Sequence, residues 1–579
     1  MFAKLQKYSS ILVILVIVLA SSWSLFSKDF FIFHDFTQGA RIVEMTQAIQ
    51  DGHLPPIWSS NLGYGYGMPL FEFYAPLPYY LGSLSYMLGI SLIGSVKLLM
   101  FISTLFTAIG AYLLGKKLFG NTGGLLVSAA LTMAPYRAVN LFVRGAISEA
   151  WGIMALPFIL LGIIKTIKNE KNGWLLLTVS ILVLLLSHNL TALVFLPLSV
   201  VFGAGYLFLE ASNNKKVKRQ FLLIVLKLAS FYALAVLLSS YYTIPALLEK
   251  DFTRLESTIL AEYFDYRLHF VGLKQFLQQN WGYGGSTYGP EDGISFYLGL
   301  GQILGLFLSG YLLVKKLIKN FVNKVKPSFD KNNLFYLLLV FLFSVSLFMT
   351  TNKSLLIWEY IPTLSFLQFP WRYLSATAIF LSLVVGSLTL LFPVKPFKYG
   401  YSAILIFILV VMNAGYFRPQ EFTSNLDDHY YSDVNKLRYQ MSNTLPDYIP
   451  IQIKEKTIEP VSLEGDVLFC QVLDDCTGNF SVITNKVHKK VIKTGFTTNR
   501  DVIFTVSDFP GWTTKIDSKI VETLRSDQGF IKVIVPAGEH VVEVKLENTD
   551  IRRIANLLSS FGLLILSTTF FWYYKRNDR

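Results

Sequence analysis

Long apolar stretches recur along most of the chain and are separated by short polar segments. Each stretch approaches the ~20 residues that a helix needs to cross a bilayer. The stretches predicted to span are residues 8–26, 96–114, 122–140, 148–166, 173–187, 190–209, 220–247, 294–314, 333–350, 373–393, 399–417 and 553–573. The pattern therefore predicts a polytopic α-helical membrane protein with about 12 spans.

Positive charge predicts the orientation of these spans, because Lys and Arg in short loops mark the cytoplasmic side. All the basic loops fall on one side if residues 76–92, which Pro and Gly interrupt, dip into the outer interface without crossing. The basic segments are Lys116/Lys117, Lys165/Lys168/Lys171, Lys215/Lys216/Lys218/Arg219, Lys315/Lys316/Lys319, Lys324/Lys326, Lys395/Lys398 and Lys575/Arg576. The external segments would then be residues 28–95, 141–147, 187–189, 248–293, 351–372 and 418–552.

Hydrophobicity falls in residues 418–552, where short β-branched runs alternate with turn residues. The runs are 502–506, 531–535 and 540–546. This pattern predicts an extracytoplasmic antiparallel β-sandwich. The expected domains are a membrane domain over 1–417 with its first external loop at 28–95, a β-rich domain over 418–552, and a final helix with a basic tail over 553–579.

Composition agrees with a membrane protein, since 53% of the 579 residues are hydrophobic and 15% are charged. The formal charge of +13 comes from Lys and Arg in short runs between apolar segments. Because these residues form no single basic face, no nucleic-acid partner is expected. Cys470 and Cys476 lie in the β-rich region, and the sequence does not decide whether they form a disulfide or remain two reduced thiols.

His34 and Asp35 follow the first predicted span directly. A carboxylate near the membrane surface is costly unless it is solvated, paired or used in function. Asp35 also precedes a helical stretch from about Thr37 to Gln50, and Asp is a favoured N-cap residue. From the residues alone, catalysis and helix capping are both open for Asp35.

A glycine-rich and aromatic segment comes next and contains Tyr64, Tyr66 and Glu72. Aromatic rings beside flexible backbone suit an extended lipid or sugar that lies along the interface. Aromatic belts also occur at membrane surfaces without any ligand. These three residues are therefore candidate substrate contacts, with a plain aromatic belt as the alternative.

Two arginines at the outer ends of predicted helices are candidate phosphate ligands, since a guanidinium can hold a phosphate through two parallel hydrogen bonds. Arg144 is one, and an ion pair with Glu149 is its alternative role. Arg372 is the other, and its alternative role is an interfacial anchor beside Trp371.

A short break between two apolar segments contains His188 and Asn189. A His and an Asn at such a break are usually caps and turn formers, and less often substrate contacts. The seven histidines show no HExxH motif, the cysteines have no zinc-finger spacing, and no GxSxG motif is present. Zinc chemistry and serine hydrolysis are therefore not supported.

Several ordered motifs together resemble the membrane proteins grouped as the "6-pyruvoyl-tetrahydropterin synthase-related domain" family. The motifs are HDF at 34–36, GYGxP at 65–69, FYAPLPYY at 73–80, RGAISEA at 144–150, SHN at 187–189 and QFPWR at 368–372. The segments DFPGWTTKIDSK and VPAGEHVVEVK resemble the C-terminal part of bacterial membrane proteins linked to cell-wall polymer glycosylation. The pterin enzyme itself uses three zinc-binding histidines, and no such triad is evident here.

Both families resemble GT-C glycosyltransferases, which take a sugar from a polyprenyl-phosphate carrier at the outer face of the plasma membrane. The resemblance implies transfer to a polysaccharide, lipid or protein acceptor of the cell envelope. It makes Asp35 the catalytic acidic residue, with His34 beside it and Glu149 as the second acidic position. In GT-C enzymes that second position is more often Asp than Glu. The resemblance therefore does not decide whether a divalent cation, Mg or Mn, is the cofactor.

Two other functions remain open. One is a lipid or polysaccharide transporter, which needs polar groups along a path through the bilayer midplane. Few such groups are present, because most ionisable residues fall at the ends of spans. The other is a non-catalytic envelope scaffold, which should tolerate loss of Asp35.

Overall fold

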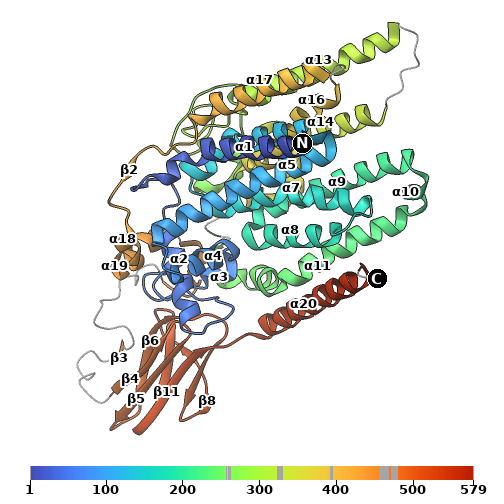
Figure 1. Ribbon diagram of the computed structural model, residues 1–579. Helices are drawn as coiled ribbons and strands as arrows, with labels where there is room; N and C mark the ends of the chain where they lie inside the picture. Colours follow the sequence, from blue (N-terminus) through green and yellow to red (C-terminus); the bar gives the residue numbers. More distant parts are fainter. Residues whose placement is uncertain are drawn as a thin grey trace. The chain divides into compact units, whose positions relative to one another are not determined.

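The computed structural model in Figure 1 describes residues 2–255, 257, 262–322, 330–391, 395–444, 446–454, 469–470 and 480–577. The chain forms two compact units, each assembled from separate segments. Unit 1 comprises Met1–Phe36, Lys97–Val236 and Glu262–Ser424. Unit 2 comprises Thr37–Val96, Leu237–Ala261 and Asn425–Arg579.

Unit 1 is a helical bundle with one short strand pair. Its helices, some shared at their ends with unit 2, are α1 (Phe2–Ser22), α5 (Leu92–Thr132), α6 (Pro135–Ala138), α7 (Ile147–Ile167), α8 (Gly173–Ser187), α9 (Asn189–Asn213), α10 (Lys215–Arg219), α11 (Phe221–Leu248), α13 (Leu300–Val322), α14 (Lys331–Phe348), α15 (Leu355–Tyr360), α16 (Leu374–Leu391) and α17 (Lys395–Ala414). Helix α7 packs on α8 and α9, and α16 packs on α13 and α14. Strands β1 (Phe30–Phe31) and β2 (Phe422–Thr423) pair antiparallel.

Within the described residues, nine helices are long and apolar enough to cross a membrane. They are Tyr8–Phe26, Leu92–Thr132, Ile147–Ile167, Asn189–Asn213, Phe221–Leu248, Leu300–Lys319, Lys331–Phe348, Pro370–Leu391 and Asp550–Trp572. Two further apolar helices, Gly173–Ser187 and Lys398–Ala414, are shorter. The predicted fold class, a polytopic helical membrane protein with a C-terminal β-rich domain, is confirmed.

The two predicted spans 96–114 and 122–140 are observed as two helices, and the second is shorter than predicted. Residues 96–114 and 122–140 lie on either side of Gly120 in α5, where φ is +78° and the helix breaks. Oγ of Ser128 donates to the carbonyl oxygen of Ala108 over 2.9 Å, a contact that a continuous helix could not make. The two halves of α5 are therefore separate helices packed against each other, as predicted. The second predicted span extends too far, because α5 ends at Thr132 and Pro135 begins the short helix α6. Proline lacks the N–H that a continuing helix would need. A π-helical turn, η2 (Val139–Val143), then leads toward α7.

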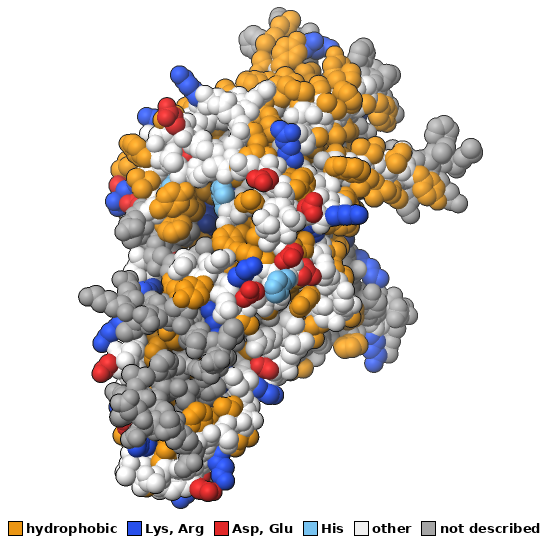
Figure 2. Space-filling model, turned by 90° about the vertical axis from the view of Figure 1, so that its left-hand side faces the viewer, with side chains coloured by type: hydrophobic (Ala, Val, Ile, Leu, Met, Phe, Trp, Pro, Cys, Tyr) orange, Lys and Arg blue, Asp and Glu red, His pale blue; other side chains and the backbone are white. Residues whose placement is uncertain are grey.

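Large apolar side chains are exposed on the outer helices of unit 1. On α13 these include Phe307, Tyr311 and Ile318, and on α17 they include Ile404 and Phe407. Figure 2 shows hydrophobic side chains, in orange, gathered at the top of the view over these helices. An exposed apolar surface of this kind suits contact with lipid.

Unit 2 combines short helices with the β-rich domain. Its helices are α2 (Gln38–Gln50), α3 (Leu70–Phe73), α4 (Leu77–Met87), α18 (Asp428–Ser432), α19 (Val434–Lys436) and α20 (Asp550–Asn577). Helix α4 has 11 residues. At 1.5 Å per residue it is about 16 Å long, roughly half of the ~30 Å hydrocarbon core. This length agrees with the expectation that residues 76–92 do not cross, whereas the side of the membrane stays a prediction.

The β-rich domain contains two antiparallel sheets, of strand order β3-β6-β10-β9 and β4-β5-β11-β7-β8. The strands are β3 (Phe469–Cys470), β4 (Phe480–Lys486), β5 (Lys489–Phe496), β6 (Arg500–Ser507), β7 (Trp512–Ile516), β8 (Lys519–Val521), β9 (Leu524–Arg525), β10 (Phe530–Val535) and β11 (Gly538–Leu546). The three predicted β-branched runs become β6, β10 and β11. Alternate residues such as Val542 and Val544 are fully buried, as expected for strands with one face in a core. Cys476 lies outside the described residues, so the predicted disulfide stays a prediction.

Candidate functional site

The segment after α1 runs along the turn that precedes α7 in unit 1. The main-chain N–H of His34 donates to the carbonyl oxygen of Val143 over 3.0 Å. The N–H of Asp35 donates to the carbonyl oxygen of Arg144 over 2.9 Å. These two hydrogen bonds hold Asp35 beside Arg144, whose guanidinium interacts electrostatically with the Asp35 carboxylate.

Gly145 permits this close approach. Its φ is +66°, in the left-handed region that glycine adopts without strain. A Cβ at this position would lie 1.9 Å from Cδ2 of Phe33. Glycine is therefore needed at this position of the RGAISEA motif, because any side chain there would displace the segment that carries Asp35.

Asp35 is not the cap of the following helix. Helix α2 begins at Gln38, and Thr37 occupies its N-cap position. Asp35 therefore lies two residues before the N-cap position, its side chain is half-buried, and its catalytic role stays a prediction. His34 is exposed, and its Nε2 lies 2.8 Å from the carbonyl oxygen of Tyr283.

Glu149 is the centre of a buried polar cluster at the start of α7. Its side chain is 1% exposed, and its Oε2 pairs with Nη1 of Arg144 at 2.7 Å. Its Oε1 accepts a hydrogen bond from the Tyr136 hydroxyl and lies 3.4 Å from Nδ2 of Asn140. The ion pair that the sequence left open for Arg144 is therefore formed.

Residues four apart supply this cluster. Tyr136, Asn140 and Arg144 recur at helical spacing through α6 and η2, which places them on one face. Arg144 also donates to the Asn140 side chain. Burial and the neighbouring Glu149 raise the pKa of Tyr136, so this hydroxyl remains a hydrogen-bond donor. Sequence reasoning missed Asn140, although its spacing from Arg144 was the available signal.

Trp371 covers the Arg144 guanidinium. The Arg144 Cζ lies 4.6 Å from the ring centroid of Trp371, a cation–π distance. The ring in turn stacks on Phe369 at 4.7 Å. The buried Nε1 of Trp371 has no hydrogen-bond partner among the described residues. Trp371 therefore lies in the wall of the cluster, and its predicted role as a substrate contact stays a prediction.

Arg372 approaches the same cluster from the start of η9 (Pro370–Tyr373), which leads into α16. Its Nη2 donates to Oε1 of Gln368 over 3.2 Å. Its Nη1 lies 3.4 Å from Nε2 of His188. Gln368 has a φ of +60°, which is uncommon for a residue with a side chain. Such backbone strain is often found at functional sites.

His188 has the capping role that the sequence left open, and its role as a substrate contact stays a prediction. Its Nδ1 accepts from the main-chain N–H of Thr191 and caps α9, while its Nε2 faces Arg372. Burial, with help from Arg372 and Arg144 and against Glu149, lowers the pKa of His188 to about 3. The imidazole is therefore neutral at pH 7. Asn189 is exposed as the first residue of α9.

The cluster thus combines two cations with one buried carboxylate. Arg144 and Arg372 carry positive charge, Glu149 balances one of them, and His188 is neutral. The main chain of Asp35 is hydrogen-bonded to that of Arg144, and its half-buried carboxylate interacts electrostatically with the Arg144 guanidinium. Such a site can hold an anion at the arginines while a carboxylate at its edge acts on a neighbouring group.

Arg137 does not join this cluster, although it lies in the same motif. Its Nη1 donates to the carbonyl oxygen of Thr132 and its Nη2 to Oγ1 of Thr104, both at 3.3 Å. Both partners are on α5. Arg137 therefore ties the turn before α7 to the bundle.

Tyr64 and Tyr66 lie in unit 2. The N–H of Tyr64 donates to Oγ of Ser442 over 3.1 Å, and its hydroxyl donates to Oδ1 of Asn443 over 2.9 Å. The buried ring of Tyr66 packs on Phe530 with centroids 4.5 Å apart. These contacts fix the glycine-rich segment within unit 2, and a role of both tyrosines in substrate binding stays a prediction.

Glu72 is also in unit 2, in a buried group of two carboxylates and one arginine. Nη2 of Arg552 lies 2.9 Å from Oε2 of Glu72 and 2.7 Å from Oε2 of Glu249. Burial and the hydrogen bond shared with Glu249 raise the pKa of Glu72 well above its usual value. The geometry gives Glu72 a structural partner, and its predicted role as a substrate contact is untested.

Glu149 fits a metal poorly, because its oxygens already face Arg144, Tyr136 and Asn140. Among the described residues, no group of three or more His, Cys, Asp or Glu could hold a metal ion. A divalent cation therefore stays an expectation, and no chemical step is derived through one.

These features define a polytopic membrane protein with a buried, charged site at the ends of its helices. The family model described as "6-pyruvoyl-tetrahydropterin synthase related domain; membrane protein" matches residues 71–419. The chain belongs to this family, as its motifs indicated.

An uncharacterized protein from Lactococcus lactis subsp. cremoris (strain MG1363) is 26% identical over 222 residues, which are 37% of this chain. The match spans 36% of that relative. The aligned region therefore covers about a third of either chain.

Three solved structures are similar to the chain at low sequence identity. The arabinofuranosyltransferase AftD from Mycobacteria is 14% identical with a TM-score of 0.41, over 72% of this chain and 27% of its own. The Archaeoglobus fulgidus oligosaccharyltransferase is 13% identical with a TM-score of 0.40, over 72% and 56%. ArnT from Cupriavidus metallidurans, bound to undecaprenyl phosphate, is 12% identical with a TM-score of 0.37, over 75% and 69%.

Proposed function

We propose that the protein is a glycosyltransferase of the plasma membrane. It transfers a sugar from a polyprenyl-phosphate-linked donor to a polysaccharide, lipid or protein acceptor of the cell envelope, on the outer face. One observation carries this proposal: the main chain of Arg144 holds Asp35 beside a buried cluster of two arginines and a single glutamate. The family motifs that resemble GT-C enzymes supply all of these residues.

Arg372 is the main ligand of the lipid phosphate in this proposal. Arg372 contacts Gln368 and His188, and its guanidinium could pair with a phosphate through two parallel hydrogen bonds. Arg144 is already balanced by Glu149, and this pair fixes its guanidinium under Trp371. The two arginines would stabilise the negative charge that develops on the phosphate as it leaves the sugar.

Asp35 is the general base. It removes the proton from an acceptor hydroxyl while that oxygen forms a bond to the anomeric carbon and the bond from this carbon to the phosphate oxygen breaks. The phosphate leaves with the electron pair of that bond. Glu149 is a positioning residue, because Arg144 and Tyr136 occupy its oxygens. His34, at the exposed edge, would contact the acceptor.

Binding of undecaprenyl phosphate to purified protein in lipid nanodiscs tests the site. We expect Arg372→Gln to weaken binding at least tenfold, the range of a lost hydrogen bond between charged groups. The control is Arg267→Gln, which removes an arginine of unit 1 that is 64% exposed and pairs with Asp265. Equal binding by wild type and the Arg372 variant would contradict the proposed donor site.

Turnover separates this enzyme from its alternatives. We expect transfer from an undecaprenyl-phosphate-linked hexose to a cell-envelope extract by the wild-type protein. A scaffold would show no transfer with any hexose, and a transporter would move the lipid-linked sugar across a vesicle membrane without breaking its glycosidic bond.

A further inference from the structure

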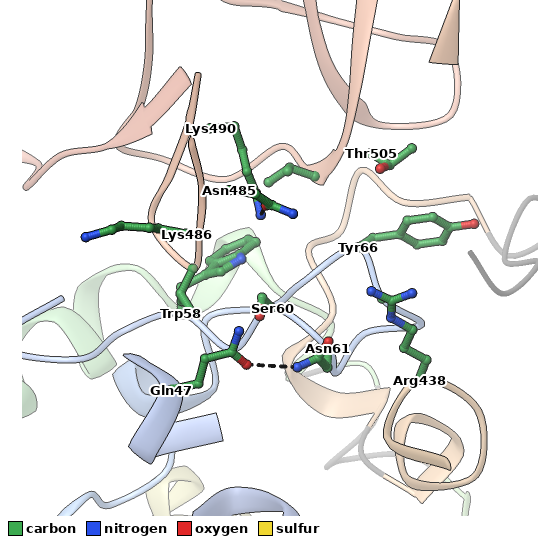
Figure 3. Close-up of a pocket in the computed structure, with 13 residues that line it drawn as sticks. Gln47, Trp58, Ser60, Asn61, Tyr66, Arg438, Asn485, Lys486, Lys490 and Thr505 are labelled. Carbon is green, nitrogen blue, oxygen red and sulfur yellow. Dashed lines mark hydrogen bonds between the residues drawn. The ribbon is translucent and has the colours of Figure 1, made fainter. Parts of the chain in front are cut away.

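Two groups of cations outside the proposed site differ in their exposure. In unit 2, Arg438 and Lys490 line a small polar cavity (Figure 3). Both side chains are buried, and Lys490 donates a hydrogen bond to the Asn485 side chain. In unit 1, the short helix α10 (Lys215–Arg219) carries four cations that are all exposed. The α10 group is therefore the one that a partner outside the chain can reach.

Helix α10 connects two helices that are each long and apolar enough to cross a membrane. One residue, Asn214, separates it from α9, and one residue, Gln220, separates it from α11. Figure 1 shows α10 in the turn between these helices, at one end of the bundle. Helix α10 therefore lies where the chain leaves the bilayer, whichever side of the membrane that end faces.

The position of α10 is fixed at both of its ends. At its start, Oδ1 of Asn214 accepts hydrogen bonds from the N–H groups of Lys216 and Val217. After its end, Oε1 of Gln220 accepts a hydrogen bond from Nδ2 of Asn169, in the turn between α7 and α8, over 3.2 Å. The four cations are therefore carried by an ordered turn of unit 1.

The sequence of α10 divides its side chains between two environments. Val217 is buried, and α10 packs on α9. The side chains that remain exposed are Lys215, Lys216, Lys218 and Arg219. The apolar residue therefore anchors the helix while the charged residues form its outer surface.

Nearby carboxylates are already paired with other lysines. Between the end of α7 and the end of α11, the acidic residues are Glu170 and Glu210. Glu170 pairs with Lys117, and Glu210 pairs with Lys331 at 2.8 Å and with Lys168 at 3.6 Å. The positive charge of α10 is therefore left to solvent or to a partner.

Exposed apolar side chains adjoin the cations on both flanking helices. Phe208, near the end of α9, is 65% exposed. On α11, Leu222 and Leu226 are 69% and 57% exposed, and residues four apart lie on one face of a helix. An apolar surface that ends in cations matches a phospholipid, whose acyl chains and charged head group follow each other in the same order. A soluble anion would match the cations alone.

We infer that α10 binds the head groups of anionic phospholipids, with phosphatidylglycerol as the representative ligand. The lysines attract the net negative charge, and Arg219 can hold a head-group phosphate through two parallel hydrogen bonds. The acyl chains of the same lipid lie against the exposed apolar residues of α9 and α11. Each Lys or Arg beside an anionic membrane surface strengthens binding about fivefold. This role goes beyond the proposed function and does not depend on sugar transfer.

The test is native mass spectrometry of the purified full chain in detergent with equal amounts of phosphatidylglycerol and phosphatidylcholine. The α10 variant carries Lys215→Gln, Lys216→Gln, Lys218→Gln and Arg219→Gln. The control variant removes three lysines and one arginine that are exposed elsewhere in unit 1, through Lys28→Gln, Lys274→Gln, Lys353→Gln and Arg418→Gln. We expect the wild type and the control to retain phosphatidylglycerol preferentially, and the α10 variant to lose at least tenfold of this preference.

Two further arms separate charge from other causes. A variant that keeps the charge, with Lys215→Arg, Lys216→Arg and Lys218→Arg, should keep the preference. Glycerol 3-phosphate at the same concentration should not displace the lipid, because it has the phosphate without the acyl chains. All the changed residues are exposed, so folding should survive, and the double variant Lys218→Gln, Arg219→Gln is a milder change that should lose part of the preference.

Four results would overturn the inference. Equal retention of the two lipids by the wild type would show that α10 is a solvated charge run. Equal losses in the α10 and control variants would show that any exposed cation suffices. Loss of the preference in the arginine variant would exclude charge as its cause, and displacement by glycerol 3-phosphate would assign the site to a soluble anion.

Discussion

The main-chain N–H of Asp35 donates to the main-chain carbonyl of Arg144 over 2.9 Å. This bond joins the segment after α1 to the turn that presents Arg144 to Glu149 and Trp371. This backbone contact therefore positions the proposed base beside Arg144, one of the two arginines of the proposed phosphate site. Changes to that contact should affect turnover even when no charged group is altered.

Gly145→Ala tests this coupling. The new Cβ would lie 1.9 Å from Phe33, which must move and carry Asp35 with it. A displacement of about 1 Å can cost about 10²-fold in rate, so we expect turnover to fall by roughly that factor. Gly400→Ala is the matched control, because nothing lies within 4 Å of its Cβ. Equal turnover rates in the two variants would refute the coupling.

Glu149→Gln should destabilise unit 1 as well as lower activity. The change leaves the 13%-exposed Arg144 without its carboxylate partner. Removing one member of a buried ion pair costs about 3–5 kcal/mol, which should appear as a clear loss of thermal stability in detergent. Asp35→Asn should melt close to wild type, since Asp35 is half-buried. A Glu149 variant with unchanged melting and normal turnover would contradict the account.

Glu72→Gln should change how the stability of unit 2 depends on pH. Burial and Glu249 raise the pKa of Glu72 in the folded state, so its protonated form is the favoured one. Its contribution to stability is complete below the unfolded-state pKa of ~4.3 and falls as pH rises through the higher folded-state value. Wild-type melting temperature should therefore decline over this range by more than that of the Gln variant. Parallel curves would show that Glu72 is not the titrating group.

Membrane orientation is tested by cysteine labelling from outside the cell. In a Cys470→Ser, Cys476→Ser background, Ser518→Cys in the β-rich domain should react with a membrane-impermeant maleimide. Lys216→Cys, in a basic loop expected to be cytoplasmic, should react only after the membrane is permeabilised. The reverse pattern would place the site on the inner face.

Much of the fold could be predicted because its signals are local. The β-branched runs became β6, β10 and β11, and most apolar stretches became single helices. A predicted boundary was wrong where one residue decides the backbone, at Pro135 after α5. Helix length and β alternation depend on neighbouring residues, so both are visible in a sequence.

Only part of the site could be predicted, because a local sequence pattern shows only contacts between residues that are close together in the chain. The Arg144 to Glu149 pair spans five residues and was weighed in advance. The approach of Arg372 to His188 joins residues 184 positions apart, and no local pattern predicts it. The cavity at Arg438 and Lys490 was missed because its walls come from segments hundreds of residues apart.

The central claim is tested most directly by the turnover of Asp35→Asn. The measurement is sugar transfer from an undecaprenyl-phosphate-linked hexose by purified protein in lipid, compared with wild type at equal donor occupancy. Asn keeps the size of the side chain and cannot accept the proton, and loss of a positioned base costs ~10²- to 10⁴-fold in rate. The account predicts a loss in this range with unchanged folding and donor binding, and activity within threefold of wild type would contradict it.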